Sequence, residues 1–132
     1  DVATVKANLR TLHACGIELS LDDFGSGYSA LSVLAHHPFA EVKIDQHMVA
    51  LIEEPRMRSA IQIALDTARH YDARFVAEGV ETVTQRDALA AMGVDTGQGH
   101  LFAAALPLCD FLAFVRASLA LSPGPAVPVP AP

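Results

Sequence analysis

Residues 19–31 read Leu-Ser-Leu-Asp-Asp-Phe-Gly-Ser-Gly-Tyr-Ser-Ala-Leu. Apolar and polar residues alternate from Ile17 to Leu21, which is the side-chain period of a β-strand. We expect a strand over residues 17–22, then a loop that contains two glycines, and then a helix that begins at Tyr28. A strand, a loop and a helix in this order predict one unit of a parallel α/β sheet.

Two adjacent carboxylates, Asp22 and Asp23, stand where this strand is expected to end. In parallel α/β folds, functional groups gather at the carboxyl ends of the strands. Neighbouring carboxylates repel each other unless a cation or a proton relieves them, and hard divalent cations prefer oxygen ligands. The pair therefore indicates a metal site. The alternative is that Asp22 caps a turn and that Asp23 is solvated.

The alternation of strand and helix recurs three more times. The other strands are expected at 40–45, 74–79 and 96–102. The helices are expected at 2–12, 28–37, 48–52, 57–68, 83–92 and 108–119. Four such units with short connections predict parallel strands. A complete (β/α)₈ barrel takes about 250 residues, so this α/β chain of 132 residues is expected to form the C-terminal half of a TIM-like barrel.

A half-barrel alone would expose two sheet edges and an apolar inner face, and both favour association. We therefore expect this chain to pair with a missing N-terminal half-barrel, or with a second copy of itself as a dimer. Residues 1–121 are assigned to the half-barrel. Residues 122–132 hold five of the eight prolines and no charged side chain, which predicts a disordered tail.

Composition narrows the classes of function. The chain is 52% hydrophobic, enough for one packed core. Its net charge of −6 argues against a basic surface that binds DNA. Neither a membrane-spanning run nor a secretory leader is found. Cys15 and Cys109 lack metal-ligand spacing and suit a reducing compartment. We expect a cytoplasmic protein, either free or as the cytoplasmic part of a membrane-bound sensor.

Side chains distant in sequence should converge at one rim of the barrel, because the carboxyl ends of all strands meet there. The candidates are Asp22, Asp23, Lys43, Glu78 and Gln98. Three acids and one lysine form a suitable two-metal site for phosphoryl transfer. Two alternatives concern single residues: Lys43 could be a solvated strand lysine, and Asp45, after the second strand, could cap the next helix or form a salt bridge.

Residues 22–31 resemble the signature loop of the EAL family, whose members are phosphodiesterases acting on cyclic di-GMP. Three further segments resemble the same family in the same order, namely Val42–Asp45, Val76–Thr82 and Gln98–Phe102. The resemblance implies a barrel fold and hydrolysis of cyclic di-GMP to linear pGpG in bacterial signalling. It also implies two Mg²⁺ or Mn²⁺ ions as cofactors.

The resemblance implies a role for each matching residue. Asp22 would bridge the two ions, while Asp23 and Glu78 would serve the second ion. Lys43 would orient the catalytic water, and Glu78 is also a candidate base. The remaining matching residues would support the site or form the loop beside it, which also makes a dimer contact in the family: Gly25, Ser26, Gly27, Tyr28, Glu81 and Gln98.

The sequence departs from the family in its metal ligands. The Glu-Ala-Leu motif is absent, together with an asparagine and a second glutamate that complete the first metal site on earlier strands. Residues 103–107 and His100 also differ from the usual pattern. The alternative function is therefore a degenerate module that binds cyclic di-GMP or a protein partner without catalysis. A third, an aldolase-like Schiff-base role for Lys43, ranks last because three nearby acids would keep this lysine protonated.

Overall fold

The computed structural model describes residues 2–25, 30–94 and 96–121. The chain forms two compact units, residues 1–102 and 103–132. The elements of the first unit are α1 (Val2–Ala14), β1 (Ser20–Phe24), α2 (Ala30–Leu34), β2 (Glu41–Ile44), α3 (Gln46–Ala50), α4 (Pro55–His70), β3 (Arg74–Ala77), α5 (Val83–Ala91) and β4 (Thr96–Gly97). The second unit contains α6 (Leu108–Leu121).

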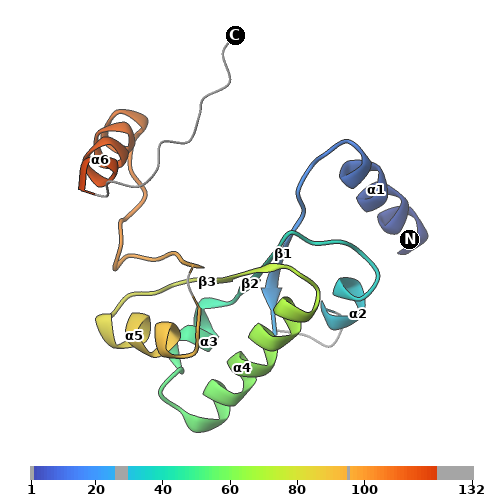
Figure 1. The fold of residues 1–132 in the computed structure, drawn as a ribbon, viewed down its shortest axis with the longest axis horizontal. Helices are drawn as coiled ribbons and strands as arrows, with labels where there is room; N and C mark the ends of the chain where they lie inside the picture. Colours follow the sequence, from blue (N-terminus) through green and yellow to red (C-terminus); the bar gives the residue numbers. More distant parts are fainter. Residues whose placement is uncertain (1, 26–29, 95, 122–132) are drawn as a thin grey trace. The chain divides into compact units, whose positions relative to one another are not determined.

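The four strands form one parallel sheet in the order β1-β2-β3-β4. Successive strands along the chain are therefore neighbours in the sheet, and helices connect them on the way (Figure 1). This is the strand–helix order of a partial α/β barrel, so the expected fold class is confirmed. The predicted tail lies outside the described residues. Among the described residues, no helix is long and apolar enough to cross a membrane.

One face of the sheet packs against α4 to form the core. Buried residues recur along α4 at helical spacing, which places them on one side of the helix: Ile61, Ala64, Leu65 and Ala68. They join buried residues that alternate along the strands: Val42, Ile44, Phe75 and Ala77. The helical stripe predicted over 57–68 thus belongs to a longer helix, which begins with Pro55 at a position where its missing N–H is not needed.

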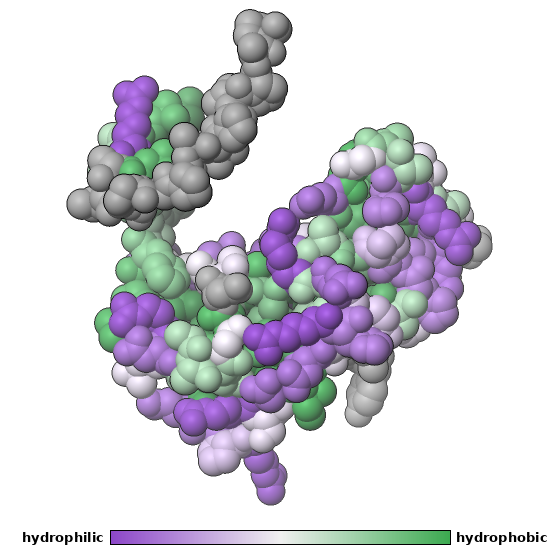
Figure 2. Space-filling model, viewed as in Figure 1, coloured by the Kyte–Doolittle hydropathy of each residue, from purple (hydrophilic) through white to green (hydrophobic). Residues whose placement is uncertain are grey.

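The opposite face of the sheet is mostly polar, and we call it the open face. It carries the polar residues Ser20, Glu41, Lys43 and Arg74, together with the buried apolar Val76. The expectation of an apolar inner face is therefore wrong for the four polar residues. The reason is the alternation of side chains along a strand, which turns Glu41 and Lys43 away from the core that holds Val42 and Ile44. In the view of Figure 2, hydrophilic and hydrophobic residues are interspersed over the surface of the first unit.

All four strands differ from their predicted bounds, and β1 and β4 differ most. β1 begins three residues later than expected and continues through both aspartates to Phe24. β4 contains only Thr96 and Gly97, because the chain then turns around Val80. The Val80 N–H donates to the Gln98 carbonyl at 3.0 Å, and the Leu101 N–H donates back to the Val80 carbonyl at 3.0 Å. These backbone bonds replace the strand ladder that was expected up to residue 102.

The capping box that Thr82 and Gln85 predict is confirmed at the start of α5. The Thr82 hydroxyl accepts from the Gln85 N–H at 3.2 Å, and the Gln85 side chain accepts from the Thr82 N–H at 3.0 Å. We expect Thr82→Ala to lower the free energy of unfolding by about 1 kcal/mol. Thr84→Ala, inside the same helix, should change it by less than about 0.5 kcal/mol. Urea denaturation of both variants measures the difference, and equal effects would contradict the capping role.

A candidate metal centre at the carboxyl ends of the strands

A β-bulge brings the two aspartates to one place. Leu21 pairs with Val42 and Phe24 pairs with Ile44, so Asp22 and Asp23 together oppose only Lys43. In a regular strand, consecutive side chains point to opposite faces. Here Asp23 adopts a left-handed backbone with φ +54°, and its N–H donates to Asp22 Oδ1 at 3.1 Å. Both carboxylates can therefore serve the same site.

Glu78 completes a cluster of three carboxylates. It directly follows β3, and its N–H donates to the Ile44 carbonyl at 3.2 Å. One oxygen from each of Asp22, Asp23 and Glu78 lies within 4.8 Å of the others. Gln98 Nε2 donates to Glu78 Oε1 at 2.9 Å, which orients this carboxylate. The structure thus brings together residues from the ends of β1, β3 and β4, as the barrel topology predicts.

Lys43 reaches this cluster from the middle of the open face. Its Nζ contacts Glu78 Oε1 and lies 3.5 Å from Asp22 Oδ1. Its side chain is only 20% exposed, so the alternative of a solvated strand lysine is wrong. The hydrogen bond to Glu78 raises the pKa of the Lys43 ammonium above its ordinary value, although partial burial acts in the opposite direction. A raised pKa is the reverse of what a Schiff-base lysine requires.

Lys43 makes stability depend on alkaline pH. Its pKa is higher in the folded chain than in the unfolded chain, so its contribution is complete below the ordinary value of 10.5 and is lost as the pH rises through the folded pKa. We expect the free energy of unfolding to fall more steeply above about pH 10 in the wild type than in Lys43→Met. Urea denaturation from neutral to alkaline pH tests this, and parallel curves for the two proteins would contradict it.

The donor set fits a hard divalent cation. Three carboxylates and one ammonium leave a formal charge of −2 at the cluster, as three negative charges and one positive charge give. Mg²⁺ and Mn²⁺ favour carboxylate oxygens over nitrogen or sulfur ligands. Asp22 is 64% exposed while Glu78 is 19% exposed, so the cluster has a solvent-facing side from which an ion and its water ligands can enter.

Asp23 offers a way to separate charge from backbone conformation. Asparagine tolerates the left-handed conformation about as well as aspartate, whereas alanine does not. We expect Asp23→Asn to keep the stability of the fold and to weaken Mn²⁺ binding at least tenfold. Asp23→Ala should lose the same affinity and about 1 kcal/mol of stability as well. Calorimetric Mn²⁺ titration and thermal denaturation check the two effects, and unchanged affinity in Asp23→Asn would remove Asp23 from the site.

The other predicted site residues are not part of the carboxylate cluster that the structure describes. Ser26, Gly27 and Tyr28 lie outside the described residues. Gly25 follows the acidic pair with φ +101°, and an added Cβ there would approach Met48 Sδ to 2.6 Å. The Glu81 side chain is exposed and does not belong to the carboxylate cluster. Asp45 caps α3 by accepting from the His47 N–H, which confirms the capping alternative.

A polar cavity beside Glu78 was not predicted. It has a volume of about 250 Å³ and lies between the first turns of α3 and α5. It is lined by Gln46, His47, Ala50, Gly79, Glu81 and Gln85. These residues come from three separate segments, so no spacing in the sequence reveals them. One of its lining residues, Gly79, directly follows Glu78 in the chain.

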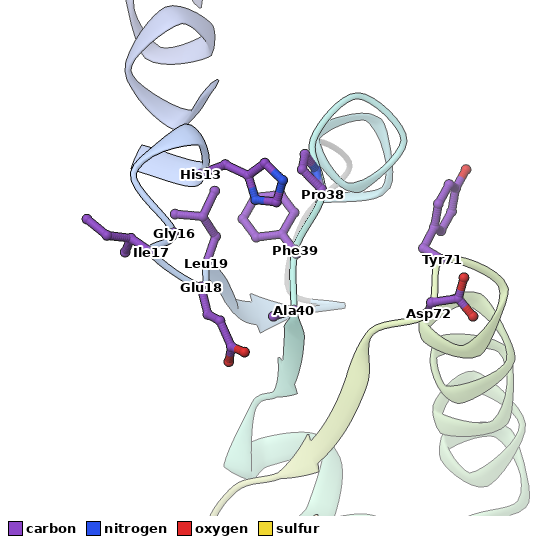
Figure 3. A pocket seen from close by; sticks show the side chains of 10 residues that line it. All are labelled: His13, Gly16, Ile17, Glu18, Leu19, Pro38, Phe39, Ala40, Tyr71 and Asp72. Atoms are coloured by element: carbon purple, nitrogen blue, oxygen red, sulfur yellow. The ribbon is translucent and has the colours of Figure 1, made fainter. Parts of the chain in front are cut away.

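A second cavity, of about 370 Å³, lies at the opposite ends of the strands. Figure 3 shows its lining residues: His13, near the end of α1, and Phe39 line one side, and Tyr71 and Asp72, which follow α4, line the other side. Glu18 and Ala40, which come just before β1 and β2, also line this cavity. This cavity is therefore separate from the carboxylate cluster, which lies where the strands end.

Comparison with known proteins identifies the family. The sequence profile described as the EAL domain matches residues 1–105. This chain belongs to the EAL domain family. It is 37% identical over 112 residues to the cyclic di-GMP phosphodiesterase RocR of Pseudomonas aeruginosa. The alignment covers 84% of this chain and 29% of RocR. The resemblance of the motifs to the EAL family is confirmed.

Solved EAL structures share the fold. The EAL domain of Mycobacterium smegmatis DcpA aligns with a TM-score of 0.82 and 30% identity, over 89% of this chain and 53% of that chain. A standalone versatile EAL protein from Vibrio cholerae O395, in its c-di-GMP-bound form, aligns with a TM-score of 0.72 and 32% identity, over 79% of this chain and 44% of that chain. The chain thus spans under a third of RocR and about half of each solved chain.

Proposed function

We propose that this EAL chain forms part of a metal-dependent phosphodiesterase that hydrolyses cyclic di-GMP to linear pGpG. The observation that carries the proposal is the cluster of Asp22, Asp23 and Glu78 in contact with Lys43. A module that only binds nucleotide has no need for all four groups at one point. The phosphodiesterases named among its relatives support the same conclusion.

Each residue of the cluster has a role that its surroundings support. Asp22, Asp23 and Glu78 would hold Mg²⁺ or Mn²⁺, which supplies Lewis-acid activation of water and of the phosphate when bound. Gln98 and Lys43 fix the Glu78 carboxylate, which can also accept a proton. The Lys43 ammonium stays protonated and can donate hydrogen bonds to water or to a phosphate oxygen. Hydrolysis adds one water across one P–O bond of the cyclic dinucleotide.

The catalytic domain would be completed by a second half-barrel. About half of the DcpA EAL domain has no counterpart in this chain. The Glu-Ala-Leu motif and its two partner ligands would belong to that half, while residues 1–121 form the other. We call the two halves together the completed domain. A cytoplasmic location agrees with its substrate, which we propose to be the second messenger itself.

The test is an assay of the completed domain, in which this chain is preceded by about 120 residues from its own gene, the size of half a barrel. We expect cyclic di-GMP to be converted to pGpG in the presence of Mg²⁺ or Mn²⁺ and to remain intact with a chelator. Chromatography of the nucleotides measures both. Tight binding of cyclic di-GMP without product in either metal would instead identify a receptor and contradict the proposal.

A further inference from the structure

The open face carries a charged layer at the end opposite the carboxylate cluster. The charged layer consists of Glu18, Ser20, Glu41 and Arg74. Ser20, Glu41 and Arg74 are paired in register across three adjacent strands. Ser20 Oγ donates to Glu41 Oε1 at 3.0 Å, and Arg74 Nη2 lies 3.0 Å from Glu18 Oε2 and 3.6 Å from Glu41 Oε2. The side chains are thus built into one network.

This network has more negative charge than positive charge. Two carboxylates share one guanidinium, which leaves a formal charge of −1. The Arg74 and Glu18 side chains are 59% and 69% exposed, so water can reach the network. A surface that covered the charged layer would remove that water. Burying an uncompensated carboxylate is costly, so the covering surface needs a cation at this level.

The charge ratio argues against a second copy of this chain as the covering surface. A second copy would bring two more carboxylates and one more guanidinium, giving four negative charges against two positive charges at the same level. The carboxylate cluster would double in the same way. A segment of different sequence has no such restriction. The part of an EAL domain that this chain does not cover has the required size, because the chain spans 53% of the DcpA domain.

We propose that the charged layer is the docking surface for that other half of the EAL barrel, and that this half places a lysine or arginine against Glu18 and Glu41. The inference rests on the proposed completion of the barrel. It adds the chemistry of the contact: the layer selects a basic partner strand and disfavours self-association through the open face.

Charge reversal tests the inference in two proteins, this chain and the completed domain. The variants are Glu18→Lys and Glu41→Lys, with Glu53→Lys, on the exposed turn before α4, as the matched control. Urea denaturation measures the loss in the folding equilibrium constant. We expect Glu18→Lys and Glu41→Lys each to lower the folding equilibrium constant at least tenfold more in the completed domain than in this chain. The control should lower it equally little in both proteins. Glu18 is mostly exposed, so its variant remains informative even if Glu41→Lys does not fold.

Three outcomes would overturn the inference. The first two are an equal loss of the folding equilibrium constant in the two proteins and an unchanged constant for the charge-reversal variants of the completed domain. The third is a dimer of this chain, seen by analytical sedimentation, that Glu41→Lys dissociates. The pGpG assay on the same preparations separates this inference from the proposed function. If charge reversal destabilises the completed domain as expected but no pGpG forms, only the proposed phosphodiesterase activity is contradicted. If pGpG forms but charge reversal has no greater effect in the completed domain, only the docking surface is contradicted.

Discussion

The Glu78→Gln variant of the completed domain should lose about 10³-fold in kcat for cyclic di-GMP, which corresponds to about 4 kcal/mol of transition-state stabilisation. The substitution keeps the size of the side chain and an oxygen that can accept from Gln98. It removes the negative charge that pairs with Lys43 and that would hold a cation. A loss of this size is expected for a group that binds a catalytic metal, because such an ion supplies several kcal/mol.

The matched control is Glu53→Gln, an exposed acid away from the cluster, which should keep wild-type kcat. Thermal denaturation of both variants separates catalysis from folding. A Glu78→Gln protein that folds and retains more than about a tenth of the wild-type rate, or about 1.4 kcal/mol, would show that Glu78 does not act in the reaction.

Gly79→Ala should destabilise the chain by about 3 kcal/mol and displace Glu78 at the same time. Gly79 has φ +67°, where a side chain costs about 1 to 2 kcal/mol. An added Cβ would also lie 2.4 Å from Gln46 Cβ and 3.1 Å from Gln46 Cα, at the start of α3. Such overpacking typically costs about 1 to 3 kcal/mol. The new methyl group cannot be accommodated by rotating a flexible side chain, because it meets the backbone end of Gln46.

Gly16→Ala isolates the backbone cost from the packing cost. Gly16 has φ +77°, and an added Cβ there would meet nothing within 4 Å. We expect a loss of about 1 kcal/mol for this variant, since only the conformation is strained. Urea denaturation of the two variants gives the packing cost by difference. Equal destabilisation at Gly16 and Gly79 would contradict the close approach of α3 to the loop that holds Glu78.

The sequence predicted that the side chains of the candidate site would come together because barrel topology converts order along the chain into position in space. Alternating strands and helices place Asp22, Glu78 and Gln98 at one rim, although 76 positions separate the first from the last. The N-cap at Asp45 and the capping box at Thr82 were also predictable, because capping depends on residues only two or three positions apart.

Other features depend on contacts that no local pattern reveals. The bulge at Asp22 and Asp23 exists only in relation to Lys43 on the next strand, so the sequence placed the end of β1 too early. β4 is short because Gly99 packs against the backbone of Val80, where an added Cβ would lie 2.2 Å from the Val80 oxygen. The polar open face, in contrast, could have been read from the alternation of Glu41 and Lys43 with Val42 and Ile44.

The most direct test of the account is a crystal structure of the completed domain grown with Mn²⁺, examined for anomalous scattering from the metal. The account predicts a Mn²⁺ peak at about 2.0 to 2.3 Å from carboxylate oxygens of Asp22, Asp23 or Glu78, and loss of that peak in Asp22→Asn. A domain that binds Mn²⁺ only elsewhere, or that leaves Asp22 and Glu78 paired with Lys43 at saturating Mn²⁺, would contradict the assignment of this cluster as the metal site.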